Sequence, residues 1–488
     1  MTWFLFAILA IGSIAVHLWS EHAEANRRAR SFANWQAAAR TLGLHFSGAE
    51  SGSADDTRSI TGVLNGAPVR ADFRREVVRT GKNRKIVDKT TVGSGGPGRI
   101  PATLSLRRDS TFRSLGRFVQ GGEDKKIGDE PFDEAVEVSE MDAWVCAALS
   151  EEARQQLADL LSRGGEIRDG TLWLETTDAA ADDPAWLPGM LQFFAQLGQR
   201  LTVTSDSLHQ RLAHNAMHDR SPSVRLQNFQ FLAEPSTATL LPLLISTARE
   251  LLADDHVPVR LAAAVHLDSE GSSVLDALAC NPRVETALRV QALRELGARG
   301  GPGLELLLTK LLGSSSPELV CAALAIIAAR HLEALSAAVV KCAANEHAEV
   351  RVAAATALGS LAANAAEPVL IRLLSDSSSE VQRASAESLG RVGSVAAVEP
   401  LLPLAERLGR AQLRQAARGA IGRIQSRLGN VEAGSLSLAD DHELAGALDI
   451  AEEPAAVRIG QVSLADDADS EQDPRARASV TPPDKPHR

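Results

Sequence analysis

A short pattern that returns roughly every 31 residues constrains the fold of this chain more than any other feature of its sequence. Each copy holds a polar turn, a hydrophobic residue that is usually followed by arginine, and then an alanine-rich stretch. The hydrophobic residues are Val224, Val259, Leu288, Leu319, Val350, Val381 and Leu413, separated by 35, 29, 31, 31, 31 and 32 residues. Units of this length bury their apolar faces only by stacking on one another. We therefore expect a solenoid over residues 205–430.

Each unit has the parts of a helical hairpin. Residues 366–374 are apolar at helical spacing, which predicts a first helix. Asn345 and Asp376 lie where a side chain could cap the second helix by accepting its free N–H groups. Gly359 and Gly390 are expected to follow that helix in a left-handed conformation and end it. About seven such hairpins should stack into a right-handed superhelix with a long concave wall.

The repeat resembles a known family. The pattern D-x-x-x-x-VR-x-x-A-x-x-ALG, followed at 345–359 and more loosely at 376–390, is similar to bacterial HEAT repeats, especially the short variety shared with phycobilisome lyases. This resemblance covers about 225 residues and implies a protein-interaction platform. It also implies that the repeat arginines pack against the aspartate turn and join adjacent repeats, whereas a ladder that binds a ligand is the alternative. Those arginines are Arg225, Arg260, Arg289, Arg351 and Arg414.

Some HEAT-type proteins are enzymes, so catalytic motifs could occur in this chain. The resemblance to HEAT repeats extends to the di-iron HEAT-repeat hydroxylases, in which His-Glu dipeptides supply the metal ligands. This chain has one His-Glu pair, His442-Glu443, and it lies outside the repeats. His209, His214 and His218 form the one histidine cluster, and Asp219 is the sole carboxylate nearby. The sequence has no P-loop and no G-x-S-x-G motif. We expect no catalytic residue, cofactor or metal. The alternative is an enzyme or cofactor-handling protein, similar to the lyases, with its site in the α+β domain that precedes the repeats or on the solenoid.

The N-terminus resembles a membrane anchor. Trp3 to Trp19 contains no Asp, Glu, Lys or Arg, and a helix of this length would be about 25 Å long, near the lower limit for a span. Ala23-Glu24-Ala25 imitates a signal-peptide cleavage site, but no positive side chain precedes the apolar segment. Positive charge follows it, at Arg27, Arg28 and Arg30. We expect an anchor at 1–22 with the bulk of the chain on the cytoplasmic side, and a periplasmic location is the alternative.

Residues 23–204 predict an α+β domain, with one antiparallel sheet and helices on one face. Asn65-Gly66 between two alternating segments predicts a hairpin. The glycine-rich stretch 93–98 formally matches G-x-G-x-x-G, but strand-like residues follow it, so we expect a hairpin loop. The expected strands are 60–64, 69–78, 85–92, 103–107, 135–138 and 172–175, and the expected helices are 32–42, 142–161 and 187–201.

Charge is unevenly distributed along the chain. Segment 70–126 has fifteen Lys/Arg against six Asp/Glu, a net charge of +9, which would either solvate a sheet face or contact anionic lipid. Stacking aromatics do not interleave with these charges, so no nucleic acid is expected. The tail 431–488 has thirteen acidic against five basic residues and is expected to be disordered. Its repeated Ser-Leu-Ala-Asp-Asp, at 437–441 and 463–467, is either a docking motif or compositional drift, and the tail could fold back on the basic segment.

Composition limits the kinds of site that we expect. Aromatic residues make up 4% of the chain and tyrosine is absent, which disfavours a deep specific pocket. Four cysteines without a Cys-x-x-Cys pair predict small buried side chains rather than a disulfide framework. The sequence as a whole predicts a membrane-anchored scaffold that binds a protein partner on the concave face of its solenoid.

Overall fold

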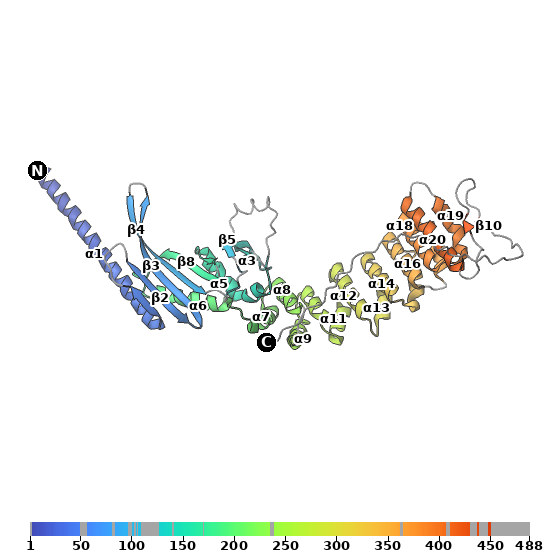
Figure 1. Ribbon diagram of the computed structural model, residues 1–488, viewed down its shortest axis with the longest axis horizontal. Coiled ribbons are helices and arrows are strands. Elements are labelled where there is room, and N and C mark those ends of the chain that lie inside the picture. The colour runs from blue at the N-terminus through green and yellow to red at the C-terminus, as the bar shows by residue number, and fades with distance from the viewer. Residues whose placement is uncertain are drawn as a thin grey trace, which may run out of the picture.

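Figure 1 shows an elongated molecule, in which a small α+β region leads into a rod of stacked helices. It is a computed structural model. The structure describes residues 2–48, 56–80, 83–95, 100–101, 104, 106–108, 126–138, 141–168, 170–234, 239–361, 365–406, 410–429, 437–438 and 448–449.

A single long helix, α1 (Thr2–Leu42), begins the chain. The sequence predicted two separate helices here, at 3–19 and 32–42, but the polar residues between them continue the helix. The N-terminal half of α1 projects away from the body (Figure 1), where Val16, Leu18 and Trp19 are 66%, 59% and 73% exposed. None of the helices in the described part of the chain combines the length and the hydropathy that a membrane span needs. The anchor expected at residues 1–22 stays a prediction.

The C-terminal half of α1 packs on a six-stranded antiparallel sheet of order β1-β2-β3-β4-β8-β7. Helix α6 (Trp186–Leu201) covers β3 and β4. Asn65 and Gly66 both have positive φ, which confirms the tight hairpin between β2 and β3. Strands β1 and β7 were not expected from the sequence. The strands are β1 (His45–Gly48), β2 (Thr57–Leu64), β3 (Ala67–Thr80), β4 (Asn83–Gly95), β7 (Glu166–Arg168) and β8 (Thr171–Thr177).

Three further predictions for this region were wrong in detail. The segment 142–161 is two helices, α4 (Ala143–Ala148) and α5 (Glu151–Ser162), because Ser150 accepts the Ala153 N–H and starts a new helix. A separate two-stranded ribbon pairs β5 (Leu106–Arg108) with β6 (Val136–Val138), next to the short helix α3 (Glu130–Ala135). Residues 93–95 belong to β4 and pair with β8 instead of forming a loop, while 96–99 lie outside the described residues.

Residues 205–429 form seven helical hairpins, which confirms the predicted number. Each second helix from α12 to α20 contacts the next one, so these helices form a continuous layer (Figure 1), hereafter the second-helix layer. The hairpins are α7 (Ser205–His218) with α8 (Pro222–Ala233), α9 (Leu241–Leu251) with α10 (Val257–Val265), α11 (Ser269–Cys280) with α12 (Thr286–Arg299), α13 (Leu304–Leu311) with α14 (Pro317–Ala329), α15 (Ser336–Cys342) with α16 (Ala348–Leu361), α17 (Ala366–Leu373) with α18 (Ser379–Val392), and α19 (Val398–Glu406) with α20 (Ala411–Gly429).

The repeated hydrophobic residues form the core of this rod. All except Leu288, which is half-buried, are at most 3% exposed. Gly359 and Gly390 do not end their helices as expected, because they lie inside α16 and α18 and neither has positive φ. These glycines allow neighbouring second helices to pack closely, since a Cβ on Gly359 would lie 2.5 Å from the Ser388 side chain of the next second helix.

The α+β region and the solenoid share buried surface. One hydrophobic cluster extends from Trp35 to Leu267, and a second extends from Leu261 to Ile424. The expected domain boundary at residue 204 therefore falls within a continuous core. Of the acidic tail, the structure describes only β9 (Ser437–Leu438) and β10 (Leu448–Asp449), which pair with each other. The disorder predicted for 431–488, and most of the two repeated motifs, lie outside the described residues.

Candidate functional site

A polar side chain organises the turn inside six of the hairpins. In each of these turns the side chain accepts the backbone N–H two residues later and holds the start of the second helix. The pairs are Asp219 with Ser221 (2.9 Å), Asp254 with His256 (2.8 Å), Asn281 with Arg283 (3.0 Å), Ser314 with Ser316 (3.2 Å), Asn345 with His347 (2.9 Å) and Asp376 with Ser378 (2.8 Å). The sequence placed Asn345 and Asp376 at this point, but the N–H groups that they accept lie just before the helix rather than inside it.

Two repeat arginines join neighbouring hairpins through these turns. Arg225 donates to the Asp219 carbonyl of its own turn (2.9 Å) and to both carboxylate oxygens of Asp254 in the next turn (2.7 and 2.8 Å). Arg351 repeats this arrangement with the Asn345 carbonyl (2.9 Å) and with Asp376 (2.8 and 2.9 Å). Both guanidinium groups are therefore occupied by the protein itself.

These contacts lower the pKa of the aspartates. Hydrogen bonds from Arg351 hold the pKa of Asp376 below its usual value. At Asp254 burial acts in the opposite direction, but hydrogen bonds from Arg225 and from the His256 N–H outweigh it and also lower the pKa. Both carboxylates are thus ionised at neutral pH and stabilise the stack in that form.

The other repeats show what happens when one partner changes. Arg260 donates to the Asp254 carbonyl of its own turn, and no carboxylate among the described residues pairs with it. Arg289 donates to the Ala279 carbonyl (3.1 Å). Arg414 is half-buried in α20, where no described residue offers it a carboxylate. Gln382 replaces the arginine of α18, and Arg410 donates to it from the next turn (3.3 Å), so donor and acceptor have exchanged places.

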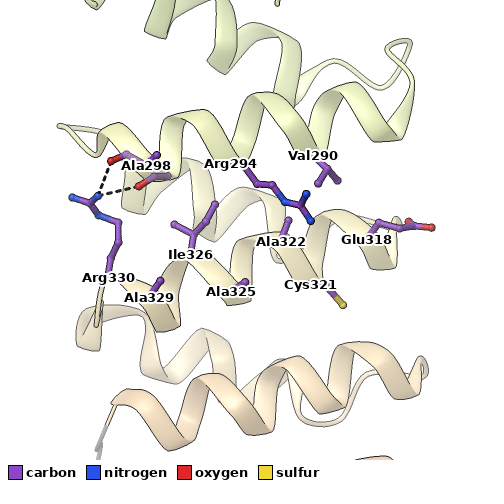
Figure 2. Close-up of a pocket in the computed structure, with 11 residues that line it drawn as sticks. Val290, Arg294, Ala298, Glu318, Cys321, Ala322, Ala325, Ile326, Ala329 and Arg330 are labelled. Carbon is purple, nitrogen blue, oxygen red and sulfur yellow. Dashed lines mark hydrogen bonds between the residues drawn. The ribbon is translucent and has the colours of Figure 1, made fainter. Parts of the chain in front are cut away.

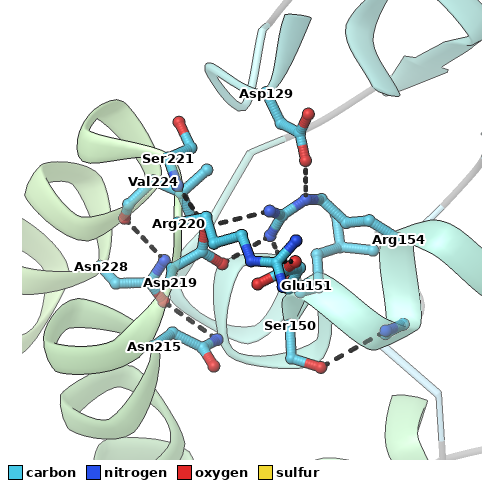
Figure 3. Close-up of polar contacts among 12 residues, drawn as sticks. Asp129, Ser150, Glu151, Arg154, Asn215, Asp219, Arg220, Ser221, Val224 and Asn228 are labelled. Atoms are coloured by element: carbon cyan, nitrogen blue, oxygen red, sulfur yellow. Dashed lines mark hydrogen bonds and ion pairs between the residues drawn. The ribbon is translucent and has the colours of Figure 1, made fainter. Parts of the chain in front are cut away.

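A similar contact joins the α+β region to the first hairpin (Figure 3). Arg154, the fourth residue of α5, is 2% exposed and donates to both carboxylate oxygens of Asp219 (2.8 and 3.0 Å). It also binds Asp129 (2.6 Å) and the Leu149 carbonyl (2.9 Å). This site was not predicted from the sequence. The sequence feature that could have predicted it is Ala153-Arg154, a hydrophobic residue followed by arginine. The two residues are the third and fourth of α5, as Val224 and Arg225 are in α8.

The second-helix layer opens into a trough between α12 and α14 (Figure 2), hereafter the α12–α14 trough, of about 560 Å³. Its lining is mostly small and apolar: Val290, Gly297, Ala298, Cys321, Ala322, Ala325, Ile326 and Ala329. Figure 2 shows Arg294 reaching from α12 across the space between the helices, while Glu318 lies at one end. At the other end, Arg330 donates to the Gly297 carbonyl (2.9 Å) and ties the two helices together.

This trough suits binding rather than covalent chemistry. Burial, with smaller effects of nearby carboxylates, raises the pKa of the Cys321 thiol, so it is neutral at physiological pH. An apolar floor flanked by Arg294, Glu318 and Arg330 can take an apolar side chain from a partner and orient it by these charges. The thiols of Cys146 and Cys342 are buried as predicted, whereas Cys280 and Cys321 are only half-buried. Burial raises the pKa of Cys146 to about 12.

The basic residues on the outer face of the sheet already have acidic partners. Lys89 binds Glu76 (3.0 Å) and Glu175 (2.9 Å), Arg74 also binds Glu175, and Arg70 binds Asp72 (3.1 Å). This part of segment 70–126 therefore carries internal ion pairs on the sheet face, and its contact with anionic lipid stays a prediction. Residues 109–125 lie outside the described residues.

A buried polar cluster fastens α1 to the sheet. Arg58, on β2, is 3% exposed, pairs with Asp56 (2.7 Å) and donates to the Ser31 hydroxyl (2.9 Å). That hydroxyl donates in turn to Asp178 (2.6 Å), which also accepts from the Trp35 indole (3.3 Å). The C-terminal half of α1 is thus held as a fixed part of the α+β region.

The histidine cluster predicted from the sequence lies on α7. His214 and His218 lie one turn apart on α7, with their ring centres 4.7 Å apart. Within the part of the chain that the structure describes, no group of three His, Cys, Asp or Glu side chains is placed to hold a metal ion.

Comparison with known proteins identifies the class of fold. The family model for HEAT repeats matches residues 336–422. A chain of the phycocyanin lyase complex of CpcE and CpcF from Nostoc is 17% identical over 46% of this chain and 94% of that one, with a TM-score of 0.27. Human deoxyhypusine hydroxylase is 17% identical over 45% of this chain and 96% of its own, with a TM-score of 0.21. YibA of Escherichia coli is 15% identical over 46% and 84%, with a TM-score of 0.33. The search of curated proteins gives no match.

Residues 336–422 thus match HEAT repeats, and residues 205–429 form an α-solenoid behind a small antiparallel sheet.

Proposed function

We propose that this chain is a scaffold that binds a protein partner on the second-helix layer of its HEAT-repeat solenoid, without catalysing a reaction. The α12–α14 trough carries the proposal, because its small apolar lining leaves room for side chains of a partner. Ala325 and Ala329 are exposed on its floor, and Arg294 is exposed at its edge. Arg225 and Arg351 bind the aspartates of the next turns, so they stabilise the stack and do not form the proposed binding surface.

Site-specific photo-crosslinking tests this proposal. A photoreactive amino acid at position 325, in the trough, should crosslink a protein partner when the full chain is expressed in its own cell. The matched control is position 306 on α13, where Leu306 is 77% exposed outside the second-helix layer. Crosslinks of equal yield at both positions, or none at 325, would reject the trough as the binding site.

The proposal also includes attachment to the cytoplasmic membrane through residues 1–22, with the solenoid in the cytoplasm. It is supported by the free N-terminal half of α1, by the exposed Leu18 and Trp19, and by Arg27, Arg28 and Arg30 after the apolar segment. Any contact of segment 70–126 with anionic lipid would depend on basic residues other than Arg74 and Lys89, which are already paired.

Fractionation of cells tests the attachment. The full chain should stay with the membranes after alkaline carbonate extraction, whereas a chain that begins at residue 23 should be released. A C-terminal reporter that is active only in the cytoplasm should be active, and activity of a periplasm-specific reporter instead would contradict the proposed orientation.

A further inference from the structure

The α12–α14 trough lies between two helices that offer no free backbone group to a partner. Within α12 and α14 the backbone N–H and C=O groups bond to one another. The carbonyls of Gly297 and Ala298, near the end of α12, accept hydrogen bonds from Arg330 (2.9 and 3.4 Å). An extended peptide laid in the trough would therefore leave its own backbone groups unpaired, which is unfavourable. A helix satisfies its backbone internally, so the trough favours a helical segment.

The small side chains of α14 leave room for a third helix. Cys321, Ala325 and Ala329 follow one another at intervals of four residues and line the trough, and both alanines are exposed. From Glu318 to Arg330 the lining follows α14 for about 18 Å, which is the length of about three helical turns. A partner helix of this length can lie along α14 with its apolar face against the alanines.

The charges around the trough follow a fixed order along it. Figure 2 shows Glu318 at one end, Arg330 at the other, and Arg294 reaching across between them. Arg294 is exposed, and no carboxylate among the described residues pairs with it. Glu318 accepts a hydrogen bond from the Ser316 hydroxyl (2.6 Å), which carries no charge. The charges of Arg294 and Glu318 are thus available to a partner.

The acidic end of the trough extends onto the next second helix. Burial and then the carboxylates of Glu349, on α16, and Glu318 raise the pKa of the Cys321 thiol, so both carboxylates lie near it. Elsewhere the described lining carries Arg294 and Arg330 without an acidic residue. A helix along α14 therefore meets negative charge at one end and positive charge over the rest. Such a surface is complementary to a helix with the reverse order of charge.

We propose that the α12–α14 trough binds an amphipathic helix of a partner protein, with a basic residue at Glu318 and an acidic residue paired with Arg294. Apolar side chains between these two charges fill the space over Ala325. Arg294 selects the partner, because a guanidinium binds a carboxylate through two parallel hydrogen bonds and repels a second cation. This inference rests on the proposed function, since it names the kind of partner that the same trough takes.

Selection of helical peptides tests this inference. A phage library of alanine-based helices, randomised on one face, would be selected on the immobilised full chain. We expect the enriched peptides to carry large apolar residues, with a basic residue about one to two turns from an acidic one. Arg294→Glu should invert the preference at the acidic position and lower affinity for the original peptides by about tenfold or more. The matched control Arg372→Glu, at an exposed arginine of α17, should change neither.

The remaining outcomes separate this inference from the proposed function. Peptides that are lost with Ala325→Glu, but show no charge preference or are unaffected by Arg294→Glu, would overturn the inference and leave the trough as a binding site. Peptides that still bind Ala325→Glu, or a library without any binder, would overturn both. A dimer in light scattering that Ala325→Glu dissociates would show that a second copy of the chain occupies the trough, which also contradicts the inference.

Discussion

At Gly390 the backbone of α18 lies so close to α20 that a Cβ would stand 2.9 Å from the Ala420 Cα and 2.6 Å from the Arg423 guanidinium. A glycine inside a helix normally weakens it by about 1 kcal/mol relative to alanine. This loss is offset because the absence of a side chain lets α18 and α20 pack closely against each other. The sequence pattern identified the glycine correctly but suggested the wrong reason, since helix ends and close helix contacts favour the same residue.

Alanine substitutions separate the two reasons. Gly390→Ala should lower the free energy of unfolding by about 1–3 kcal/mol, because α20 must move away from the new Cβ. Gly422→Ala should leave stability unchanged or raise it by up to about 1 kcal/mol, since no described atom is near. Urea unfolding followed by circular dichroism measures both. A loss of stability at Gly422 as large as that at Gly390 would contradict the packing role.

The Arg225–Asp254 pair is a second test at the scale of the residue. Asp254→Asn keeps an acceptor for the His256 N–H, as Asn345 does in its own turn, but it leaves the nearly buried Arg225 guanidinium with only the exposed Asp255 as an ionic partner. We expect a loss of about 2 kcal/mol of unfolding free energy. The control Asp276→Asn removes an exposed carboxylate on α11 and should have almost no effect. Similar losses for both variants would show that the pair contributes nothing specific.

The same aspartates predict how stability depends on pH. Their pKa values are lower in the folded chain than the value of about 3.9 expected after unfolding. Their contribution is therefore complete above that value and is lost as the pH falls through the folded pKa values. Unfolding free energy should drop below about pH 4, and the drop should be smaller for the double variant Asp254→Asn, Asp376→Asn. Identical pH profiles would contradict the assignment.

At the scale of elements, the hairpin at Asn65-Gly66 and most strands followed from alternation and turn residues. Strands β1 and β7 are only four and three residues long, too short for the alternation to stand out. The break between α4 and α5 was hidden because apolar residues continue through it, and only the Ser150 cap marks it. The sequence predicted two helices in place of α1 because the residues between them are polar. The middle of α1 is exposed to solvent, so it forms a helix without a row of apolar side chains.

Arg154 decides whether the α+β region and the solenoid behave as one unit. Arg154→Met should leave Asp219 buried and unpaired and cost about 3–5 kcal/mol. Hydrogen exchange in α4 and α7 should accelerate together, because both elements rest on this contact. Arg163→Met, at an exposed pair with Asp159 near the end of the same helix, should change stability by about 0.5 kcal/mol at most. Acceleration confined to α7 would show that the junction is not cooperative.

At the scale of the whole molecule, the repeat period alone was enough to predict seven stacked hairpins, because spacing fixes where each unit begins. It did not predict the shared core across residue 204 or the α12–α14 trough. Both depend on contacts between distant segments, such as α4 with α7 or Ile326 beneath Gly297, which leave no periodic signal in the sequence. The candidate site is therefore a property of the assembled rod, although each side chain in it belongs to an ordinary repeat.

The most direct test of the scaffold account measures affinity for the partner that crosslinking identifies. Ala325→Glu places a charge on the apolar floor of the trough, and Leu306→Glu places the same charge on the exposed surface of α13. We predict that the dissociation constant rises at least tenfold for Ala325→Glu, equivalent to about 1.4 kcal/mol, and changes less than twofold for Leu306→Glu. Unchanged affinity for Ala325→Glu, with both variants folded, would contradict the claim that this solenoid binds its partner on the second-helix layer.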